Sequence, residues 1–333
     1  MHIKKKRGLS LDIMYSIIIM KKLKKLIQIA IVFILLCSSV SSSYAAPKIG
    51  LALGEGGIKF YIHIGVLKVL ESEGIKLDCI AGTSIGSLIG GLYALWEDVD
   101  KIEEYALSLD FDSYHMSPRE DITLQNIDET SFLIFYTDVS KDKINIPLLK
   151  GLMDGKIMRD GIDRLTNRAS FEYDLKIPFK VITTDLITGE KVVIGKGRIS
   201  NAIAASMSVP GMSIPFKYED KMLVDGALID PVPADIVREM GADIVIGVNL
   251  SDVQEDTLPV FNNVVSILLR SVYIMLGELD EISANKADIV IRPHYRGPLS
   301  TDIETEKKLQ LIKLGEEETK KIIPLLKKLI NSY

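Results

Sequence analysis

The sequence predicts an α/β fold with a mostly parallel sheet that is covered by helices on both faces. Short, nearly continuous apolar runs alternate along the chain with segments in which apolar residues recur at helical spacing. These runs lack the polar–apolar alternation of a half-exposed strand, as expected for a parallel sheet buried on both sides. With 47% hydrophobic and 26% charged residues, the composition excludes a largely disordered chain.

The elements follow in order along the chain. A first strand, Ile49–Leu53, precedes a helix over 61–73, and a second strand, 79–81, leads through a turn into a helix over 85–95. Later strands are expected at 179–184, 191–194, 222–224, 244–249 and 289–292, with helices at 200–206, 234–240 and 264–279. The last helix, 303–329, is expected to be interrupted near Gly315 and Pro324, because both residue types disfavour a helix interior.

Residues 110–160 break this alternation with a mixture of polar residues and short apolar patches. An insertion of this size above an α/β sheet is expected to be either a cap over the site or an irregular connection without a function.

The N-terminal segment, residues 1–45, has the pattern of a secretory signal peptide. Lysines at 21–25 precede an apolar run at 26–37, and Ser43 and Ala45 occupy the −3 and −1 positions of a cleavage site. We expect translation to start at Met20 or Met14 and the protein to be exported to the periplasm, the cell surface or the medium. The alternative is an uncleaved membrane anchor, although the run is shorter than the ~20 residues that a spanning helix needs.

The remaining chain, residues 46–333, is expected to form a single domain. It holds 32 basic and 44 acidic residues, a net charge of 32 − 44 = −12, which argues against a nucleic-acid partner. Its one cysteine, Cys79, excludes an internal disulfide and is expected to be a buried apolar residue. Neither zinc-type Cys/His spacing nor a calcium loop occurs, so no metal or other cofactor is expected.

A GxSxG motif, Gly82-Thr83-Ser84-Ile85-Gly86, lies between the second strand and the following helix. In such a strand-to-helix turn the serine adopts a strained conformation, and the flanking glycines avoid clashes with the neighbouring backbone. The hydroxyl then lies at the carboxyl edge of the sheet and beside a helix N-terminus, which favours developing negative charge. Ser84 is therefore the candidate nucleophile.

A glycine-rich loop, residues 54–59 (GEGGIK), follows the first strand. A dinucleotide-binding loop would need a third glycine where Lys59 stands and an acidic residue at the end of the next strand, and both are missing. An oxyanion hole needs only a pair of aligned N–H groups, which Gly56 and Gly57 can supply.

A third motif, Asp225-Gly226-Ala227, ends a strand. If that strand runs with the others, Asp225 lies at the same sheet edge as Ser84 and can reach its hydroxyl directly. A base for serine must bind a proton near neutral pH, so we expect burial to raise the pKa of Asp225 from its ordinary value.

Together, the three motifs in this order resemble the patatin-like phospholipase family, and the likeness extends over most of residues 48–320, including 202–215 and 225–249. The resemblance implies a three-layer architecture and a Ser–Asp dyad, with Ser84 as nucleophile and Asp225 as proton acceptor. It also implies an oxyanion hole at Gly56 and Gly57. The implied reaction is hydrolysis of acyl esters of phospholipids or other lipids, of the phospholipase A, lysophospholipase or esterase type.

Two positions depart from the glycine loop of that family, where GGGxKG or GGGxRG is usual. Glu55 replaces its first glycine and Phe60 its last. These changes motivate an alternative in which the fold is kept by a lipid-binding or regulatory protein with a weakened site.

Two other catalytic arrangements also stay open. A Ser84–Asp225–His294 triad would match the chain order of an α/β-hydrolase, and Asp185, at another strand end, is a competing base for a dyad. His63 falls inside the first helix and is expected to have a structural role.

A lipid hydrolase must meet a membrane surface, so a peripheral membrane partner is expected. Lysines and apolar residues at 320–330 form a possible amphipathic tail for that contact. The alternative is a packed terminal helix with a solvated lysine face.

Overall fold

The computed structural model describes residues 14–29, 46–108, 138–140, 143–145, 155–210, 213–251, 264–295 and 304–333. The chain divides into two compact units, Met1–Ala46 and Pro47–Tyr333. In the first unit, residues 14–29 form a helix with exposed side chains, and most of the expected signal-peptide apolar run at 26–37 lies outside the described residues. Among the described helices, none combines the length and the apolar character needed to cross a membrane.

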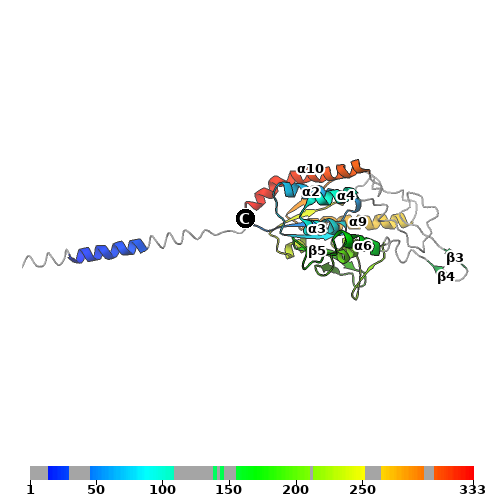
Figure 1. Cartoon of the computed structure of the whole chain (residues 1–333), viewed down its shortest axis with the longest axis horizontal. Coiled ribbons are helices and arrows are strands. Elements are labelled where there is room, and N and C mark those ends of the chain that lie inside the picture. Colours follow the sequence, from blue (N-terminus) through cyan, green and yellow to red (C-terminus); the bar gives the residue numbers. More distant parts are fainter. Residues whose placement is uncertain are drawn as a thin grey trace, which may run out of the picture. The chain divides into compact units, whose positions relative to one another are not determined.

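The second unit is built around an eight-stranded sheet (Figure 1). Its strands are β1 (Ile49–Leu53), β2 (Cys79–Thr83), β5 (Phe179–Asp185), β6 (Lys191–Ile194), β7 (Phe216–Tyr218), β8 (Lys221–Asp225), β9 (Ile244–Val248) and β10 (Ile289–Ile291). The order is β10-β9-β1-β2-β5-β8-β7, and β6 also pairs with β5. The first five strands in this order are parallel, whereas β6, β7 and β8 are antiparallel to their neighbours, so the predicted mostly parallel sheet is confirmed.

The helices among the described residues of this unit are α2 (Tyr61–Ser72), α3 (Ile85–Trp96), α4 (Val99–Ser108), α6 (Gly155–Leu165), α7 (Ile199–Ser206), α8 (Ala234–Glu239), α9 (Val264–Ala284) and α10 (Thr305–Ile330). The 3-10 turns η1 (Gly57–Phe60) and η3 (Gly226–Leu228) follow β1 and β8. The structure adds α4, α6 and β7 to the predicted elements. Of the expected cap at 110–160, only the hairpin β3 (Asp138–Ser140) and β4 (Lys143–Asn145) and the start of α6 lie within the described residues.

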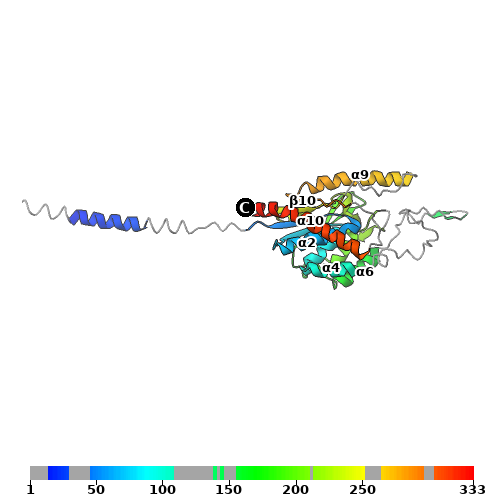
Figure 2. The same ribbon diagram turned by 90° about the horizontal axis from the view of Figure 1, so that it is seen from above.

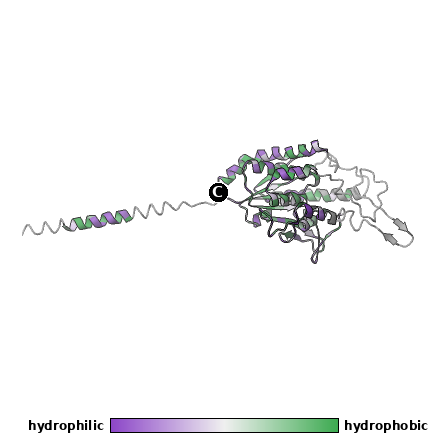
Figure 3. Cartoon of the chain, in the orientation of Figure 1, coloured by the Kyte–Doolittle hydropathy of each residue, from purple (hydrophilic) through white to green (hydrophobic). Residues whose placement is uncertain are grey.

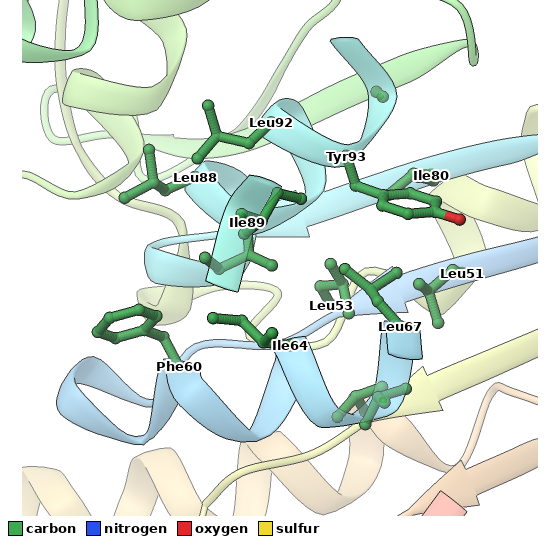
Figure 4. Packing of buried hydrophobic residues seen from close by; sticks show 14 of the residues in the cluster. Leu51, Leu53, Phe60, Ile64, Leu67, Ile80, Leu88, Ile89, Leu92 and Tyr93 are labelled. Atoms are coloured by element: carbon green, nitrogen blue, oxygen red, sulfur yellow. The ribbon is translucent and has the colours of Figure 1, made fainter. Parts of the chain in front are cut away.

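Alternate residues of β1 enter two different cores, one on each face of the sheet. Leu51 and Leu53 join a large cluster with α2 and α3, whereas Ala52 belongs to a smaller cluster with α8. Figure 4 shows part of the large cluster: Leu51, Leu53, Ile64, Leu67, Ile80, Ile89 and Leu92. On the other face a Cβ atom at Gly50 would lie only 2.1 Å from the side chain of Val237 in α8. In Figure 2, α9 and α2 lie on opposite sides of the unit. The predicted layers of helix, sheet and helix are therefore present.

The expected interruption of the last helix was wrong, because α10 is continuous through Gly315 and Pro324. Glycine at 315 is needed for packing: a Cβ there would lie 2.2 Å from the backbone oxygen of Ile62 in α2, and one at Gly65 would lie 2.0 Å from that of Ile312. The two glycines let α2 and α10 approach closely. Both polar and apolar residues occur along α10 (Figure 3). Leu311, Ile312, Ile323 and Leu326 are buried in the core, whereas Leu309 and Leu325 are exposed. The structure therefore supports the packed terminal helix rather than the amphipathic tail.

β8 begins at the carboxyl edge of the parallel strands and runs in the opposite direction to them. It runs antiparallel to β5, with Leu223 opposite Asp185 and Asp225 opposite Thr183. Thr83, at the end of β2, lies opposite Ile182 on the other side of β5. Asp225 therefore lies level with the end of β2, as expected, although the expectation assumed a parallel strand and that assumption was wrong.

Candidate active site

Ser84 occupies a sharp turn between β2 and α3, with φ 53° and ψ −127°. Only glycine adopts this backbone conformation without strain. The turn also brings backbone segments very close together: a Cβ at Gly82 would lie 2.5 Å from the oxygen of Gly86, and one at Gly86 would lie 2.3 Å from that of Leu53. Close backbone contacts therefore require both glycines of the motif, as the sequence predicted.

Hydrogen bonds on both sides hold the turn. The carbonyl oxygen of Ser84 accepts from the Ser87 amide (2.9 Å) and hydroxyl (2.5 Å). The amide N–H of Ser84 donates to the hydroxyl oxygen of Ser206 (2.8 Å), and the Thr83 hydroxyl donates to the carbonyl oxygen of Asp230 (2.8 Å). Each polar backbone atom of the strained serine thus has a partner.

The structure brings Ser84 and Asp225 together. The Ser84 hydroxyl donates to Asp225 Oδ2 over 2.6 Å, and Oδ1 accepts from the amide of Ala227 (2.9 Å). Both residues are buried. The hydrogen bond is direct, with no imidazole between the two side chains, which is the arrangement expected of a dyad rather than of a triad.

Burial raises the pKa of Asp225 to about 7. The hydrogen bonds from Ser84 and Ala227 oppose this rise, and the nearby negative charge of Glu55 adds to it. The expected upward shift is confirmed, and its main physical cause is desolvation. A carboxylate with this pKa can accept a proton near neutral pH.

The glycine-rich loop has two backbone amides at the start of η1 that differ from their neighbours in hydrogen bonding. The amides of Gly54 and Glu55 donate to the carbonyl oxygens of Val248 (3.0 Å) and Pro231 (3.1 Å). In contrast, the amides of Gly56 and Gly57 have no acceptor among the residues that the structure describes. Gly57 has φ 52°, and nothing lies within 4 Å of the position of a Cβ there. These are the two amides that the sequence assigned to an oxyanion hole.

His63 anchors this loop from α2. Its Nε2 lies 2.9 Å from the carbonyl oxygen of Gly54, and because a carbonyl only accepts, Nε2 carries the proton. Burial lowers the pKa of His63 to about 4, so the imidazole is neutral. The same Gly54 oxygen would lie 2.5 Å from a Cβ at Gly86, so the loop and the serine turn are in contact. The expected structural role of His63 is confirmed.

The two departures from the glycine pattern have different consequences. The Phe60 ring is buried in the core (Figure 4). Its centroid lies 4.0 Å from that of Tyr61, and α2 still begins at Tyr61. Glu55 is half-buried, and its charge raises the pKa of both Asp225 and the buried Asp280 of α9. Glu55 thus makes the candidate base more basic.

The alternative catalytic residues lie in other surroundings. Asp185 accepts hydrogen bonds from Thr188 (3.1 Å) and the amide of Ile187 (3.2 Å). Desolvation would raise the pKa of Asp185, but these bonds outweigh it and the pKa is lowered. His294 is exposed and follows β10, at the opposite edge of the sheet from β8. Neither side chain is hydrogen-bonded to Ser84.

Sequence reasoning missed the contacts from the end of α7. Besides Ser206, the carbonyl oxygen of Ser208 accepts from the amide of Asp225 (3.0 Å). Nothing in the sequence pattern distinguishes these serines from ordinary helix-end residues. Elsewhere, Cys79 is buried as expected, and burial raises its pKa to about 11. Within the described ranges, no three His, Cys, Asp or Glu side chains are grouped to hold a metal ion.

Comparison with known proteins identifies relatives of this chain. Residues 51–238, more than half of the chain, match the family model for patatin-like phospholipases. An uncharacterized NTE family protein of Mycobacterium tuberculosis is 28% identical over 207 residues, 62% of this chain and 50% of the relative. The lysophospholipase nte1 of Aspergillus fumigatus is 31% identical over 218 residues, 66% of this chain and 13% of the relative.

The chain spans about half the length of the NTE family relatives and a smaller part of the fungal one. Among solved structures, VipD from Legionella pneumophila aligns with a TM-score of 0.45 at 12% identity, over 86% of this chain and 67% of that one.

Proposed function

Because the chain belongs to the patatin-like phospholipase family, we propose that it is a lipid acyl hydrolase that uses Ser84 and Asp225 as a catalytic dyad. The observation that carries the proposal is the direct 2.6 Å hydrogen bond from the Ser84 hydroxyl to Asp225 Oδ2. The strained conformation of Ser84 and the raised pKa of Asp225 add support, because both suit an activated nucleophile.

In the first half of the proposed reaction, Asp225 removes the hydroxyl proton as Ser84 Oγ attacks the carbonyl carbon of the ester. The oxygen that becomes negative accepts from the amides of Gly56 and Gly57, each worth about 3 kcal/mol in comparable sites. When the carbon–oxygen bond of the ester breaks, protonated Asp225 gives its proton to the leaving alcohol. An acyl-serine ester remains on Ser84.

In the second half, water replaces the alcohol. Asp225, ionised again, removes a proton from the water, which attacks the acyl carbonyl in the same oxyanion site. Collapse of this intermediate releases the fatty acid and returns the proton to Ser84 Oγ. The cycle needs no imidazole and no group beyond the chain's own residues, because a carboxyl group whose pKa is about 7 can serve as base and acid in turn.

The proposed substrates are phospholipids or lysophospholipids. The lysophospholipase relatives and the patatin-like phospholipase domain-containing protein 6 of Mus musculus, which is 30% identical over 224 residues, support this class. Both substrates contain a fatty acyl ester, the bond that Ser84 would attack with Asp225 as its base.

A peripheral membrane contact is also proposed, and α9 is the surface that supports it. Four apolar side chains at heptad-like spacing on α9 are 46–70% exposed: Ile267, Ile274, Met275 and Ile282. Residues 264–277 contain no acidic residue, although the chain from residue 46 carries a net charge of −12. Three of the four side chains, Ile267, Ile274 and Met275, lie in this acid-free part, whereas Ile282 follows Glu281. An apolar helix surface without negative charge over residues 264–277 suits the surface of a phospholipid bilayer.

Sedimentation with phosphatidylcholine vesicles tests this contact. We expect Met275→Glu to reduce the bound fraction, because it adds a charge to this helix surface. Leu309→Glu is the matched control, since Leu309 is an exposed apolar residue on α10. Equal binding of both variants would contradict the bilayer assignment, and a change in oligomeric state of Met275→Glu alone would indicate self-association instead.

We also propose that residues 1–45 are a targeting segment that is removed on export. The division of the chain into units at Ala46 lies one residue from the expected cleavage after Ala45, which supports this proposal. N-terminal sequencing of the protein recovered outside the cytoplasm should begin at Ala46. An intact N-terminus in a membrane fraction would indicate the uncleaved anchor.

Fatty-acid release from phospholipid vesicles tests the central proposal. We expect release by the wild-type protein and none by Ser84→Ala, while Ser72→Ala, a surface serine of α2, keeps wild-type activity. A serine-directed phosphonate should label the wild type at Ser84. Labelling without release would indicate another acyl substrate. If the folded wild type neither releases fatty acid nor is labelled, the dyad proposal fails and a lipid-binding protein with a weakened site is favoured.

A further inference from the structure

Ser206, the last residue of α7, lies between β5 and the turn that carries Ser84. Its side-chain oxygen accepts from the amide of Ser84 over 2.8 Å and lies 2.6 Å from the carbonyl oxygen of Ile182. A carbonyl can only accept, so the Ser206 proton points to Ile182 and the oxygen is left to receive the Ser84 amide. The direction of both bonds is therefore determined, and the side chain is fully buried.

The same short segment also holds the second member of the dyad. Two residues beyond Ser206, the carbonyl oxygen of Ser208 accepts from the amide of Asp225 over 3.0 Å. The Ser208 hydroxyl donates to the carbonyl oxygen of Ala204 (2.8 Å), which ties the segment back to α7. One three-residue segment thus contacts the backbone of both Ser84 and Asp225, which lie 141 positions apart in the sequence.

From these contacts we infer that Ser206 is a positioning residue, which holds the strained serine turn in register with Asp225. The inference rests on the proposed dyad, because its consequence is catalytic. The backbone of Ser84 is in a region that serine avoids, and α3 holds only its carbonyl side, through Ser87. The hydrogen bond from the Ser84 amide to the Ser206 hydroxyl oxygen holds the amide side of the turn.

The bond to Ser206 also assigns the amides of the site to separate roles. Since the Ser84 amide is occupied by the Ser206 oxygen, it is not available to a developing oxyanion. The unpaired amides of Gly56 and Gly57 are left for that purpose. Removing the Ser206 hydroxyl would leave the Ser84 amide without its acceptor. The separation between Ser84 Oγ and the Asp225 carboxylate would then vary more. Misplacement of a nucleophile lowers the rate of attack more than it lowers the affinity for the substrate.

Ser206→Ala tests the inference, with Ser200→Ala as matched control. Ser200 is also a buried serine of α7, but its hydroxyl donates to Asp163 of α6 (2.6 Å), away from the dyad. For Ser206→Ala we expect kcat for ester hydrolysis to fall about tenfold or more with KM unchanged, and phosphonate labelling of Ser84 to slow in parallel. Ser200→Ala should keep wild-type kcat even if its melting temperature falls by as much as that of Ser206→Ala. Equal kcat values in the two variants would refute the positioning role.

A crystal structure of Ser206→Ala gives a readout that does not depend on activity. We expect the separation of Ser84 Oγ and Asp225 Oδ2 to exceed hydrogen-bond range, from 2.6 Å in the wild type. An unchanged turn and dyad would overturn the inference. If the wild type neither hydrolyses lipid nor reacts with phosphonate, the proposed function fails, and this structural comparison still decides whether Ser206 positions the turn.

Discussion

Replacing Asp225 with asparagine removes a proposed base and a buried ionisable group together, so activity and stability should change in opposite directions. The amide can keep the local contacts: its oxygen can accept from Ala227, and its NH2 group can donate to Ser84 Oγ. It cannot accept the hydroxyl proton, so hydrolysis should be lost while the fold is retained. In the wild type, a base with a pKa of about 7 is only about 1% ionised at pH 5, which predicts a roughly hundredfold fall in kcat/KM from its plateau.

The stability change follows from the pKa of Asp225, which burial raises from 3.8 to about 7. Between these values the folded state holds the proton and the unfolded state has lost it. Stability from this group is therefore fully present below about pH 4 and is lost as pH rises through 7. The difference amounts to a penalty on the order of 4 kcal/mol above pH 7. Asparagine carries no such penalty, so the variant should be more stable than the wild type at pH 8 and gain little at pH 4.

Two measurements check this reasoning on the same protein samples. The pH dependence of ester hydrolysis should show an acid limb near pH 7 in the wild type and no measurable rate in Asp225→Asn. Thermal unfolding from pH 4 to 9 should show the melting temperature of the variant rising above that of the wild type as pH increases. Retained hydrolysis by a folded Asp225→Asn protein would refute the dyad. A variant less stable than the wild type at pH 8 would refute burial as the cause of the raised pKa.

Three further predictions concern the surroundings of the dyad. Glu55→Gln should move the acid limb of the pH–rate profile to lower pH, because the Glu55 charge raises the pKa of Asp225; an unmoved limb would contradict that coupling. Asp280→Asn should raise the free energy of unfolding increasingly from pH 5 to 9, by several kcal/mol at the upper end in chemical denaturation. The reason is that burial raises the pKa of Asp280 to about 8, so the wild type loses stability as pH rises through that value. Gly86→Ala should cost roughly 3 kcal/mol or more in chemical denaturation, since its Cβ would lie 2.3 Å from a backbone oxygen of β1, whereas Gly195→Ala, with its nearest neighbour at 3.4 Å, should change stability by less than about 1 kcal/mol.

Local chemistry determined much of this protein from its sequence alone. The apolar runs predicted the strands because a strand buried on both faces has few polar residues. The glycines at 82 and 86 predicted a sharp turn at Ser84, because only a residue without a side chain tolerates such close backbone contacts. The sequence motifs also indicated the family, the two residues of the proposed dyad and the two glycines of the proposed oxyanion hole.

Only the tertiary structure decided how these parts meet. That β8 is antiparallel, and that its register places Asp225 opposite Thr183, depends on pairing between distant strands, which no local pattern records. The bond from the Ser84 amide to Ser206 joins residues 122 positions apart. The continuity of α10 through Gly315 depends on its close contact with α2, which reverses the local preference of glycine to end a helix. At Gly315, long-range packing outweighs a helix propensity of about 1 kcal/mol. For the β8 register and the Ser84–Ser206 bond, packing selects one of several arrangements that local chemistry does not distinguish.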